Sequence, residues 1–449
     1  MALAVQIASA WRMESPRPGK GIPHMYRELR EQAESCREDV TALTQALVRT
    51  PSFSFREEAV AEIVQNALQE LRYDLVFRDE VGNVIGFLAG SEEGPTVLLA
   101  SHMDTQRPGE EHSEEENPFS GRVDRGRVKG LGAAGCKSGL AAHVFAGHIL
   151  DKSLVPIYGT IVVAATVAQE EGNGAGVRYL LDETLPKLGI TPDLAILGEP
   201  TTLLICGGHD GWADIDVRIG SIDAATARRA TGVIHSALTG ASTHAFWRGK
   251  RSSLHVSEPE YGERDGLHEA VLRVRCRVKT DEAVANCVGL VKRLALSASE
   301  PAGDVRMEVH VHNERRRFYT GKTVEVLCWN NPWSSDPSAP LFHRALDALA
   351  AAGWRDTAPR TLELSGFGLS TAGSLLEDSY HIPTLCFGPG DEKRVCTAGE
   401  AVDVEKLVDA VFGTAVLVHG AIGTPLSLVW PTHRAPRESG WISTSRADR

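Results

Sequence analysis

The sequence has no paired cysteines, no long apolar run and no excess of positive charge. Its eight cysteines stand singly, without a CxxC pair, and a chain of 449 residues can build its cores without disulfides. We interpret them as reduced thiols of a cytoplasmic protein. No apolar stretch reaches the roughly 18–20 residues that span a bilayer, and the first residues lack the basic start and cleavage site of a secretory signal. These absences argue against a secreted or membrane protein.

The charge balance excludes a further class of partner. The net charge is −12 at pH 7, whereas binding to a nucleic-acid backbone needs a clustered positive face. We interpret the basic run NERRRF (313–318) as solvated surface. The expected partner is therefore a small-molecule substrate, with no nucleic acid and no membrane.

Short apolar runs alternate with helical segments over much of the chain. Continuous apolar runs at residues 96–102, 159–168 and 193–199 are typical of strands buried on both faces of a parallel sheet. Amphipathic segments at 137–150 and 174–185 separate them. This alternation predicts an α/β domain with a mixed, largely parallel sheet. Further helices are expected at 26–48, 55–71, 340–354 and 399–422, and a further strand at 382–390.

A different rhythm starts near residue 209. Alternating strand patterns at 211–219, 268–280 and 305–312 surround helical segments at 223–238 and 281–298. Two strand–helix units with an extra strand between them predict an inserted βαββαβ (ferredoxin-like) domain. The expected parts are an N-terminal extension (1–25), the α/β domain in two pieces (26–208 and 317–422), the inserted domain (209–316) and a disordered C-terminal tail (423–449).

Two polar clusters follow apolar runs, where open α/β sheets place their sites. SHMDT (101–105) holds His102 and Asp104, and an imidazole can ligate a metal while a nearby carboxylate fixes its ring. AQEEGNG (168–174) holds Glu170 and Glu171, of which one could ligate a metal and the other act as general base. An acidic loop that caps the next helix would look the same.

A third cluster, LGEPT (197–201), ends another apolar run at Glu199. By itself it fits a simple strand-end turn as well as a metal ligand. The cluster is informative because of its position along the chain. It is the third polar cluster to follow a predicted strand of the same sheet.

Taken together, the motifs resemble those of the M20 metallopeptidases, the family of acetylornithine deacetylase, succinyl-diaminopimelate desuccinylase and aminoacylase. That family carries GHxDxVP, a PF…GRGxxDxKGG loop, a DEE-like pair, EPT, and GPG…H followed by a glutamate. This chain has SHMDTQRP, NPFSGRVDRGRVKGLGAAGCKSG, QEEGNG, GEPT and FGPGDEKRVCTAGE. The resemblance covers roughly residues 30 to 420, and it implies that the inserted domain is a lid.

The resemblance also implies roles for individual residues. His102 and Glu199 would bind one zinc ion, and Asp104 would orient the ring of His102. Glu170 would be the general base that deprotonates the attacking water, and Glu171 would bind a second zinc ion. Such a site hydrolyses the amide bond of an N-acyl amino acid or a small peptide.

Three site positions of the family are changed in this chain. The aspartate that bridges the two metals aligns with Gly135, with Cys136 beside it, and the late histidine aligns with Cys396. No histidine follows the first lid strand within a few residues. Two dications about 4 Å apart repel each other by roughly 15–20 kcal/mol at an effective dielectric near 20, and the bridging carboxylate that offsets this repulsion is missing. We therefore expect one zinc ion rather than two, or none, with Co²⁺ or Mn²⁺ as alternatives.

The two cysteines leave several roles open. A thiolate is an excellent zinc ligand, so Cys396 could join His102, Glu171 and Glu199 around a single ion. Cys396 could also be a nucleophile or an inert replacement. Cys136 is the weaker candidate ligand, because it flanks the vacated bridging position.

Three functions remain open at this stage. The first is a metal-dependent amide hydrolase, favoured because an abandoned site would not need to keep all three acidic and imidazole motifs. The second is a cysteine-dependent enzyme of acyl transfer or cyclisation, and the third is a non-catalytic binding protein. Ser370 and Thr371 are candidate substrate contacts or simple turn residues. Because dimerisation through the lid is common in the family, a homodimer is a further expectation.

Overall fold

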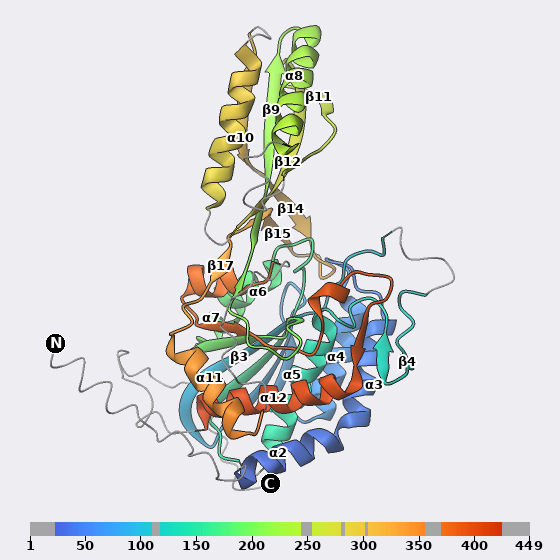
Figure 1. Cartoon of the computed structure of the whole chain (residues 1–449), viewed down its shortest axis with the longest axis vertical. Helices are drawn as coiled ribbons and strands as arrows, with labels where there is room; N and C mark the ends of the chain where they lie inside the picture. The colour runs from blue at the N-terminus through green and yellow to red at the C-terminus, as the bar shows by residue number, and fades with distance from the viewer. Residues whose placement is uncertain are drawn as a thin grey trace, which may run out of the picture.

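The computed structural model describes residues 23–109, 117–153, 155–243, 254–279, 283–300, 304–354 and 370–423. The predicted N-terminal extension as far as residue 22, and the predicted tail from residue 424, lie outside the described residues. Figure 1 shows an elongated molecule, with a broad lower part built around a sheet and a narrow upper part in which two long helices lie beside a second sheet.

The lower part is built on a six-stranded sheet with the order β1-β2-β6-β3-β7-β18. Its strands are β1 (Leu75–Arg78), β2 (Val84–Ala89), β3 (Glu92–His102), β6 (Tyr158–Thr166), β7 (Leu194–Leu197) and β18 (Thr384–Cys386). The four strands from β6 to β18 are parallel, and β1 and β2 form an antiparallel edge. The predicted α/β class with a largely parallel sheet is confirmed.

Helices cover both faces of this sheet, which explains the continuous apolar runs of its central strands. One face carries α2 (His24–Ser35), α3 (Arg37–Arg49), α4 (Glu58–Glu70), α5 (Cys136–Lys152), α11 (Pro340–Ala351) and α12 (Val404–Ile422). The other carries α6 (Ala175–Tyr179), the π-helical turn η1 (Leu180–Thr184), α7 (Leu185–Lys187) and the π-helical turn η3 (Leu375–Ser379). The single helix predicted at 26–48 is two helices, which meet at Cys36.

The upper part is an antiparallel sheet with the order β10-β12-β9-β13. It contains β9 (Gly211–Ser221), α8 (Ala224–Thr243), β10 (Leu254–Val256), β11 (Glu260–Arg264), β12 (Leu267–Val278), α10 (Val284–Ser299) and β13 (Arg306–Val311). Alternate residues of β9 and β12 pack against the two helices, which accounts for their period of two. The predicted inserted βαββαβ architecture is confirmed, whereas its boundaries at residues 209 and 316 and its role as a lid stay predictions.

Several short strands were not predicted. A hairpin of β14 (Asn313–Arg317) and β15 (Thr323–Leu327) lies at the neck between the two parts (Figure 1). The edge strands β1 and β2 of the main sheet were not predicted either. The same holds for β4 (Arg122–Asp124), β5 (Arg127–Lys129), β8 (Gly208–His209), β16 (Trp329–Asn330), β17 (Trp333–Ser334) and β19 (Ala401–Asp403), with the short helix η4 (Glu392–Arg394) before β19. None of the helices in the described part of the chain combines the length and apolarity needed to cross a membrane.

Helix α5 lies unusually close to the end of β7. A Cβ atom on Gly139 of α5 would lie 1.9 Å from the carbonyl oxygen of Gly198. Only a glycine allows this approach, because the obstacle is backbone rather than a movable side chain. The small-residue run of the α5 sequence therefore places the start of this helix against the turn that follows β7.

We expect Gly139→Ala to lower the free energy of unfolding by about 1–3 kcal/mol, the usual cost of overpacking a tight site. The matched control is Gly232→Ala in α8, where an added Cβ meets nothing within 4 Å. That change should be neutral or stabilise the protein by up to about 1 kcal/mol, because alanine is the better helix former. Urea unfolding measures both, and equal stabilities would contradict the close packing of α5 on β7.

Candidate metal centre

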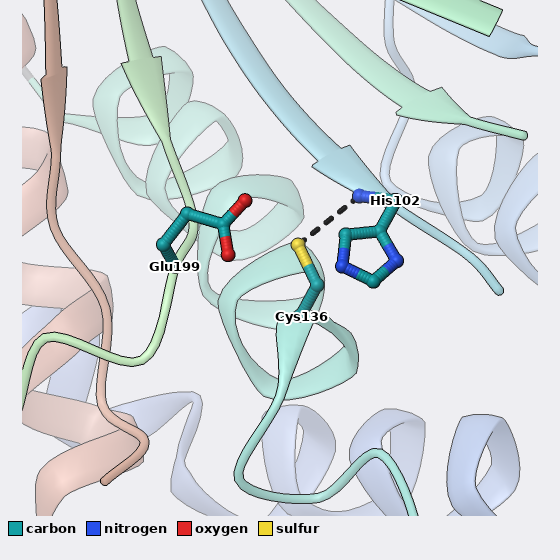
Figure 2. Close-up of side chains that lie close together, drawn as sticks. All are labelled: His102, Cys136 and Glu199. Atoms are coloured by element: carbon teal, nitrogen blue, oxygen red, sulfur yellow. Dashed lines mark hydrogen bonds between the residues drawn. The ribbon is translucent and has the colours of Figure 1, made fainter. Parts of the chain in front are cut away.

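The candidate site lies where the parallel strands end. His102 is the last residue of β3, and Glu199 follows β7 by two residues. Cys136 is the first residue of α5, which approaches the same edge of the sheet. Figure 2 shows the three side chains gathered between the ends of these elements. Segments that are far apart in sequence thus meet at the carboxyl edge of the sheet, where α/β folds bind ligands.

His102, Cys136 and Glu199 form a group of potential metal ligands. One ligand atom from each lies within 4.8 Å of the other two, and all three residues are buried. The donor atoms are a nitrogen, a sulfur and a carboxylate oxygen, which is the ligand chemistry of zinc sites in proteins. Within the described residues, this is the only such group of three or more.

The ring of His102 is oriented by Asp104. Its Nδ1 lies 2.9 Å from the carbonyl oxygen of Asp104 and 3.2 Å from Oδ1 of the same residue. Since both oxygens can only accept, Nδ1 carries the proton and donates. The remaining nitrogen, Nε2, lies 4.0 Å from Oε1 of Glu170, and it has a free lone pair when the ring is neutral. This is the tautomer in which Nε2 can bind a metal.

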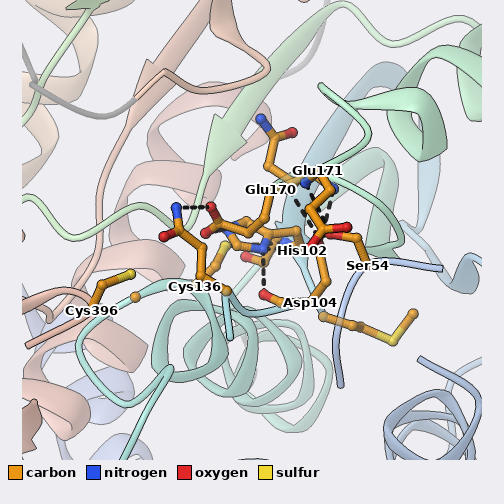
Figure 3. Close-up of polar contacts among 12 residues, drawn as sticks. Ser54, His102, Asp104, Cys136, Glu170, Glu171 and Cys396 are labelled. Atoms are coloured by element: carbon orange, nitrogen blue, oxygen red, sulfur yellow. Dashed lines mark hydrogen bonds and ion pairs between the residues drawn. The ribbon is translucent and has the colours of Figure 1, made fainter. Parts of the chain in front are cut away.

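The Asp104 carboxylate also holds the loop after β6 (Figure 3). It accepts hydrogen bonds from the Ser54 hydroxyl (2.5 Å) and from the backbone N–H groups of Gln169 (3.1 Å) and Glu170 (2.8 Å). The Ser54 oxygen in turn accepts from the N–H of Glu171 at 3.0 Å. The His102 ring, together with the bonds from Ser54 and Glu170, lowers the pKa of the Asp104 carboxyl against the effect of burial. The loop is therefore fixed relative to the His102 ring.

Glu170 is placed for proton transfer. The Gln106 side chain donates to its Oε2 at 2.9 Å, which leaves Oε1 toward His102. Burial raises the pKa of Glu170, and the nearby Asp104 carboxylate adds to the rise. A carboxylate with a raised pKa is a better base near neutral pH than an ordinary surface glutamate.

Cys136 and Glu199 are acidic groups with little access to water. The Cys136 sulfur accepts the backbone N–H of His102 at 3.1 Å and lies 3.6 Å from the carbonyl oxygen of Gly198. Burial raises the pKa of its thiol, and Glu199 adds to this. Burial likewise raises the pKa of Glu199 to about 7. A bound cation would stabilise the charged forms of both groups, so the residues present fit a metal ion.

Two of the predicted ligands do not join this group. The Glu171 carboxylate accepts a hydrogen bond from Arg316 at 3.1 Å, and 42% of its side chain is exposed. Cys396 lies in a turn with φ of 61°, and its N–H donates to Glu400 at 2.9 Å. Figure 3 shows its sulfur apart from the His102 cluster. Cys136, the weaker candidate from sequence, contributes the sulfur instead.

The comparisons with known proteins identify the family of this chain. The sequence pattern of Peptidase family M20/M25/M40 matches residues 98–419. The chain belongs to this family. Its members are hydrolases, and one M20 protein of similar fold, YxeP of Bacillus subtilis, is described as a dinuclear metal binding peptidase.

Relatives of this M20 chain differ in how much of it they match. The uncharacterized protein YgeY of Escherichia coli (strain K12) is 26% identical over 425 residues, which is 91% of this chain and 98% of the relative. A succinyl-diaminopimelate desuccinylase of Caulobacter sp. (strain K31) is 28% identical over 194 residues, 41% of this chain and 49% of its own length. The YxeP structure superimposes with a TM-score of 0.60 at 17% identity, covering 86% and 98% of the two chains.

Glu400 is a site residue of this M20 chain to which the sequence analysis gave no role. Its carboxylate is buried and accepts the N–H groups of Ala134 (2.9 Å), Gly135 (3.1 Å) and Cys396 (2.9 Å). It therefore ties the loop that leads into Cys136 to the turn at Cys396. The available signal was its place shortly after the GPG motif. Burial raises the pKa of Glu400 to about 7, although these bonds favour the charged form.

Glu57 was missed altogether. Its Oε1 accepts the N–H groups of Phe55 and Ala168, at 3.0 and 2.9 Å, and both residues have positive φ angles. It thereby holds the two strained loops that carry Ser54 and Glu170. No local motif marks such a residue, because one of its partners, Ala168, is 111 positions away from it in the sequence.

Ser370 and Thr371 have structural partners in the described part of the chain. The Asn330 side chain donates to the Ser370 hydroxyl at 2.7 Å and to the Thr371 carbonyl at 2.9 Å. The Thr371 hydroxyl accepts from the N–H of Gly373 at 3.0 Å, and Thr371 is buried. A contact between these two residues and substrate stays a prediction.

The raised pKa of Glu400 predicts a pH dependence of stability. The folded protein keeps this carboxyl protonated up to about pH 7, whereas the unfolded chain loses the proton near the ordinary value of 4.5. The contribution of Glu400 to stability must therefore fall as pH rises through this window, by on the order of 3 kcal/mol. We expect metal-free Glu400→Gln to lack this decrease in the free energy of unfolding. Denaturant unfolding from pH 4.5 to 8 measures it. The exposed control Glu62→Gln should keep it, and identical slopes for all three proteins would contradict the assignment.

Proposed function

We propose that this chain is a metal-dependent hydrolase of an amide bond in an N-acyl amino acid or a small peptide, with a single Zn²⁺ ion bound by His102, Cys136 and Glu199. The observation that carries the proposal is the meeting of these three ligand atoms within 4.8 Å, with the Glu170 carboxylate beside them. Membership of a family of peptidases and deacylases supports the class of bond.

The ligand set favours zinc. Thiolate and imidazole bind Zn²⁺ and Co²⁺ well, whereas Mn²⁺ prefers an all-oxygen set. Three protein ligands with a fourth position left for water or substrate are typical of catalytic zinc sites. When bound, the ion supplies a Lewis acid that acidifies water and polarises the amide carbonyl.

Glu170 acts as the general base in this proposal. Gln106 holds one of its oxygens, so Oε1 is the atom that takes the proton from the attacking water and delivers it to the leaving amine. Asp104 acts indirectly, because it fixes both the His102 tautomer and the backbone of Glu170. It is a positioning residue in this scheme.

A second candidate is a cysteine-dependent acyl transfer. The first turn of α5 holds the Cys136 sulfur close to the His102 ring, and Asp104 orients that ring. Cysteine nucleophiles use the same order of groups. Against this candidate, Cys136 is only 2% exposed and burial raises its pKa, whereas a nucleophilic thiol needs a lowered pKa and access to substrate.

The metal proposal predicts different effects of the two cysteines. Cys136→Ala removes one of three ligands, so we expect Zn²⁺ affinity to fall at least 100-fold in a competition titration with a chromophoric chelator. Cys396→Ala is the matched control, and it should bind Zn²⁺ within about threefold of the unchanged protein. With Co²⁺ bound, the sulfur-to-metal absorption band should vanish only in Cys136→Ala. Loss of that band in Cys396→Ala alone would contradict the ligand set.

The catalytic proposal predicts that Glu170→Gln keeps the metal and loses turnover. The amide cannot accept the water proton, so kcat should fall by about 10²–10⁴-fold while bound zinc stays at one equivalent. Hydrolysis of a panel of N-acetyl amino acids and dipeptides, followed by amine release, measures the effect. The cysteine candidate would be favoured instead if turnover survives Glu170→Gln but disappears in Cys136→Ser, and if alkylation by iodoacetamide disappears in Cys136→Ser as well.

A further inference from the structure

We propose that Arg316 is the second cation of this site: its guanidinium neutralises Glu171 and, together with the glycine at position 135, limits the site to one metal ion. This inference rests on the proposed function, because it presupposes a metal at His102, Cys136 and Glu199. It identifies the residues of this chain that set the number of bound ions.

The first observation is the partner of Glu171. Its carboxylate lies 3.1 Å from a guanidinium nitrogen of Arg316 rather than among the three clustered ligands. Yet the Glu171 backbone is anchored in the site, because its N–H donates to the Ser54 oxygen that also bonds Asp104. A carboxylate held in place at the site is thus already paired with a cation.

The second observation is how firmly Arg316 is held. Its guanidinium carbon lies 4.6 Å from the centre of the Phe55 ring, which is a cation–π contact. Phe55 packs edge-on against Phe318 at 5.2 Å, and both rings are buried. Phe318 directly follows β14, so the same hairpin supplies both the guanidinium and an aromatic support. An ordinary surface ion pair contributes little to stability, but this cation rests on a fixed platform.

A second dication bound by Glu171 would therefore have to sit beside a guanidinium that cannot swing away freely. Like charges a few ångströms apart repel each other, and water at these partly exposed side chains reduces that repulsion without abolishing it. Arg316 would therefore weaken a second metal site. The first site would not be affected, because Glu171 is not one of its three ligands.

The third observation concerns the space at Gly135. A Cβ atom there would lie 3.8 Å from Glu400 Oε1 and 3.8 Å from Gly132 Cα, which is ordinary van der Waals contact. The atoms around position 135 thus leave room for a Cβ atom. An aspartate can be introduced at this position to test its effect on metal number.

The experiment counts bound ions. Metal-free full-length protein is dialysed against buffered Zn²⁺ or Co²⁺, and metal per chain is measured by elemental analysis, with calorimetry for the affinities. The variants are Arg316→Ala and the double variant Gly135→Asp with Arg316→Ala. Arg315→Ala is the matched control, since it removes the same charge from the adjacent position of β14, whose side chain points to the opposite face of the strand.

We expect one ion in the unchanged protein and in Arg315→Ala, and two in the double variant. Arg316→Ala alone should strengthen binding of a second ion at least tenfold, with the first affinity and the cobalt–sulfur band unchanged. Two ions in the unchanged protein, or one in a folded double variant, would overturn the inference and leave the proposed function standing. No bound ion in the unchanged protein would overturn both. If the double variant does not fold, an unaltered second affinity in Arg316→Ala overturns the inference.

Discussion

The buried carboxylate of Asp104 is the interaction on which the site depends. One charge joins the end of β3 to the loop after β6 and to the segment before α4, through Ser54, Gln169 and Glu170. Because a buried charge is costly unless it is fully hydrogen-bonded, these segments stabilise the carboxylate and are in turn fixed by it. The tautomer of His102 follows from the same residue. The fold thus sets the base and the imidazole relative to each other without any metal.

Around this network, the proposed site differs from a two-metal centre in the placement of its charges. Position 135 has no carboxylate, Arg316 supplies a fixed positive charge next to Glu171, and Cys136 brings sulfur into the cluster. A single thiophilic ion needs no bridging carboxylate, because there is no second dication to repel it. The three changes are therefore mutually consistent, which argues for an altered site rather than an abandoned one.

Much of the fold could be predicted from periodicity. The buried runs of β3, β6 and β7 and the alternating strands of the inserted domain each have a clear period, and the structure has them in the expected order. The β14–β15 hairpin was missed because its charged sequence reads as solvated surface. Its function in the fold comes from Phe318 and Arg316, which contact Phe55 more than 250 positions away. The pattern of a short segment does not indicate contacts with residues so far away in the sequence.

The sequence by itself determined that His102, Glu170 and Glu199 lie at one edge of the sheet, because the carboxyl ends of parallel strands meet there. It also determined family membership, since the motifs follow in order. Only the tertiary structure decided which sulfur joins the imidazole. Cys136 and Cys396 both stand next to family site positions, but a ligand must lie within a few ångströms of its partners and point toward them. That direction depends on the start of α5 and on the bonds of Glu400, which distant parts of the chain impose.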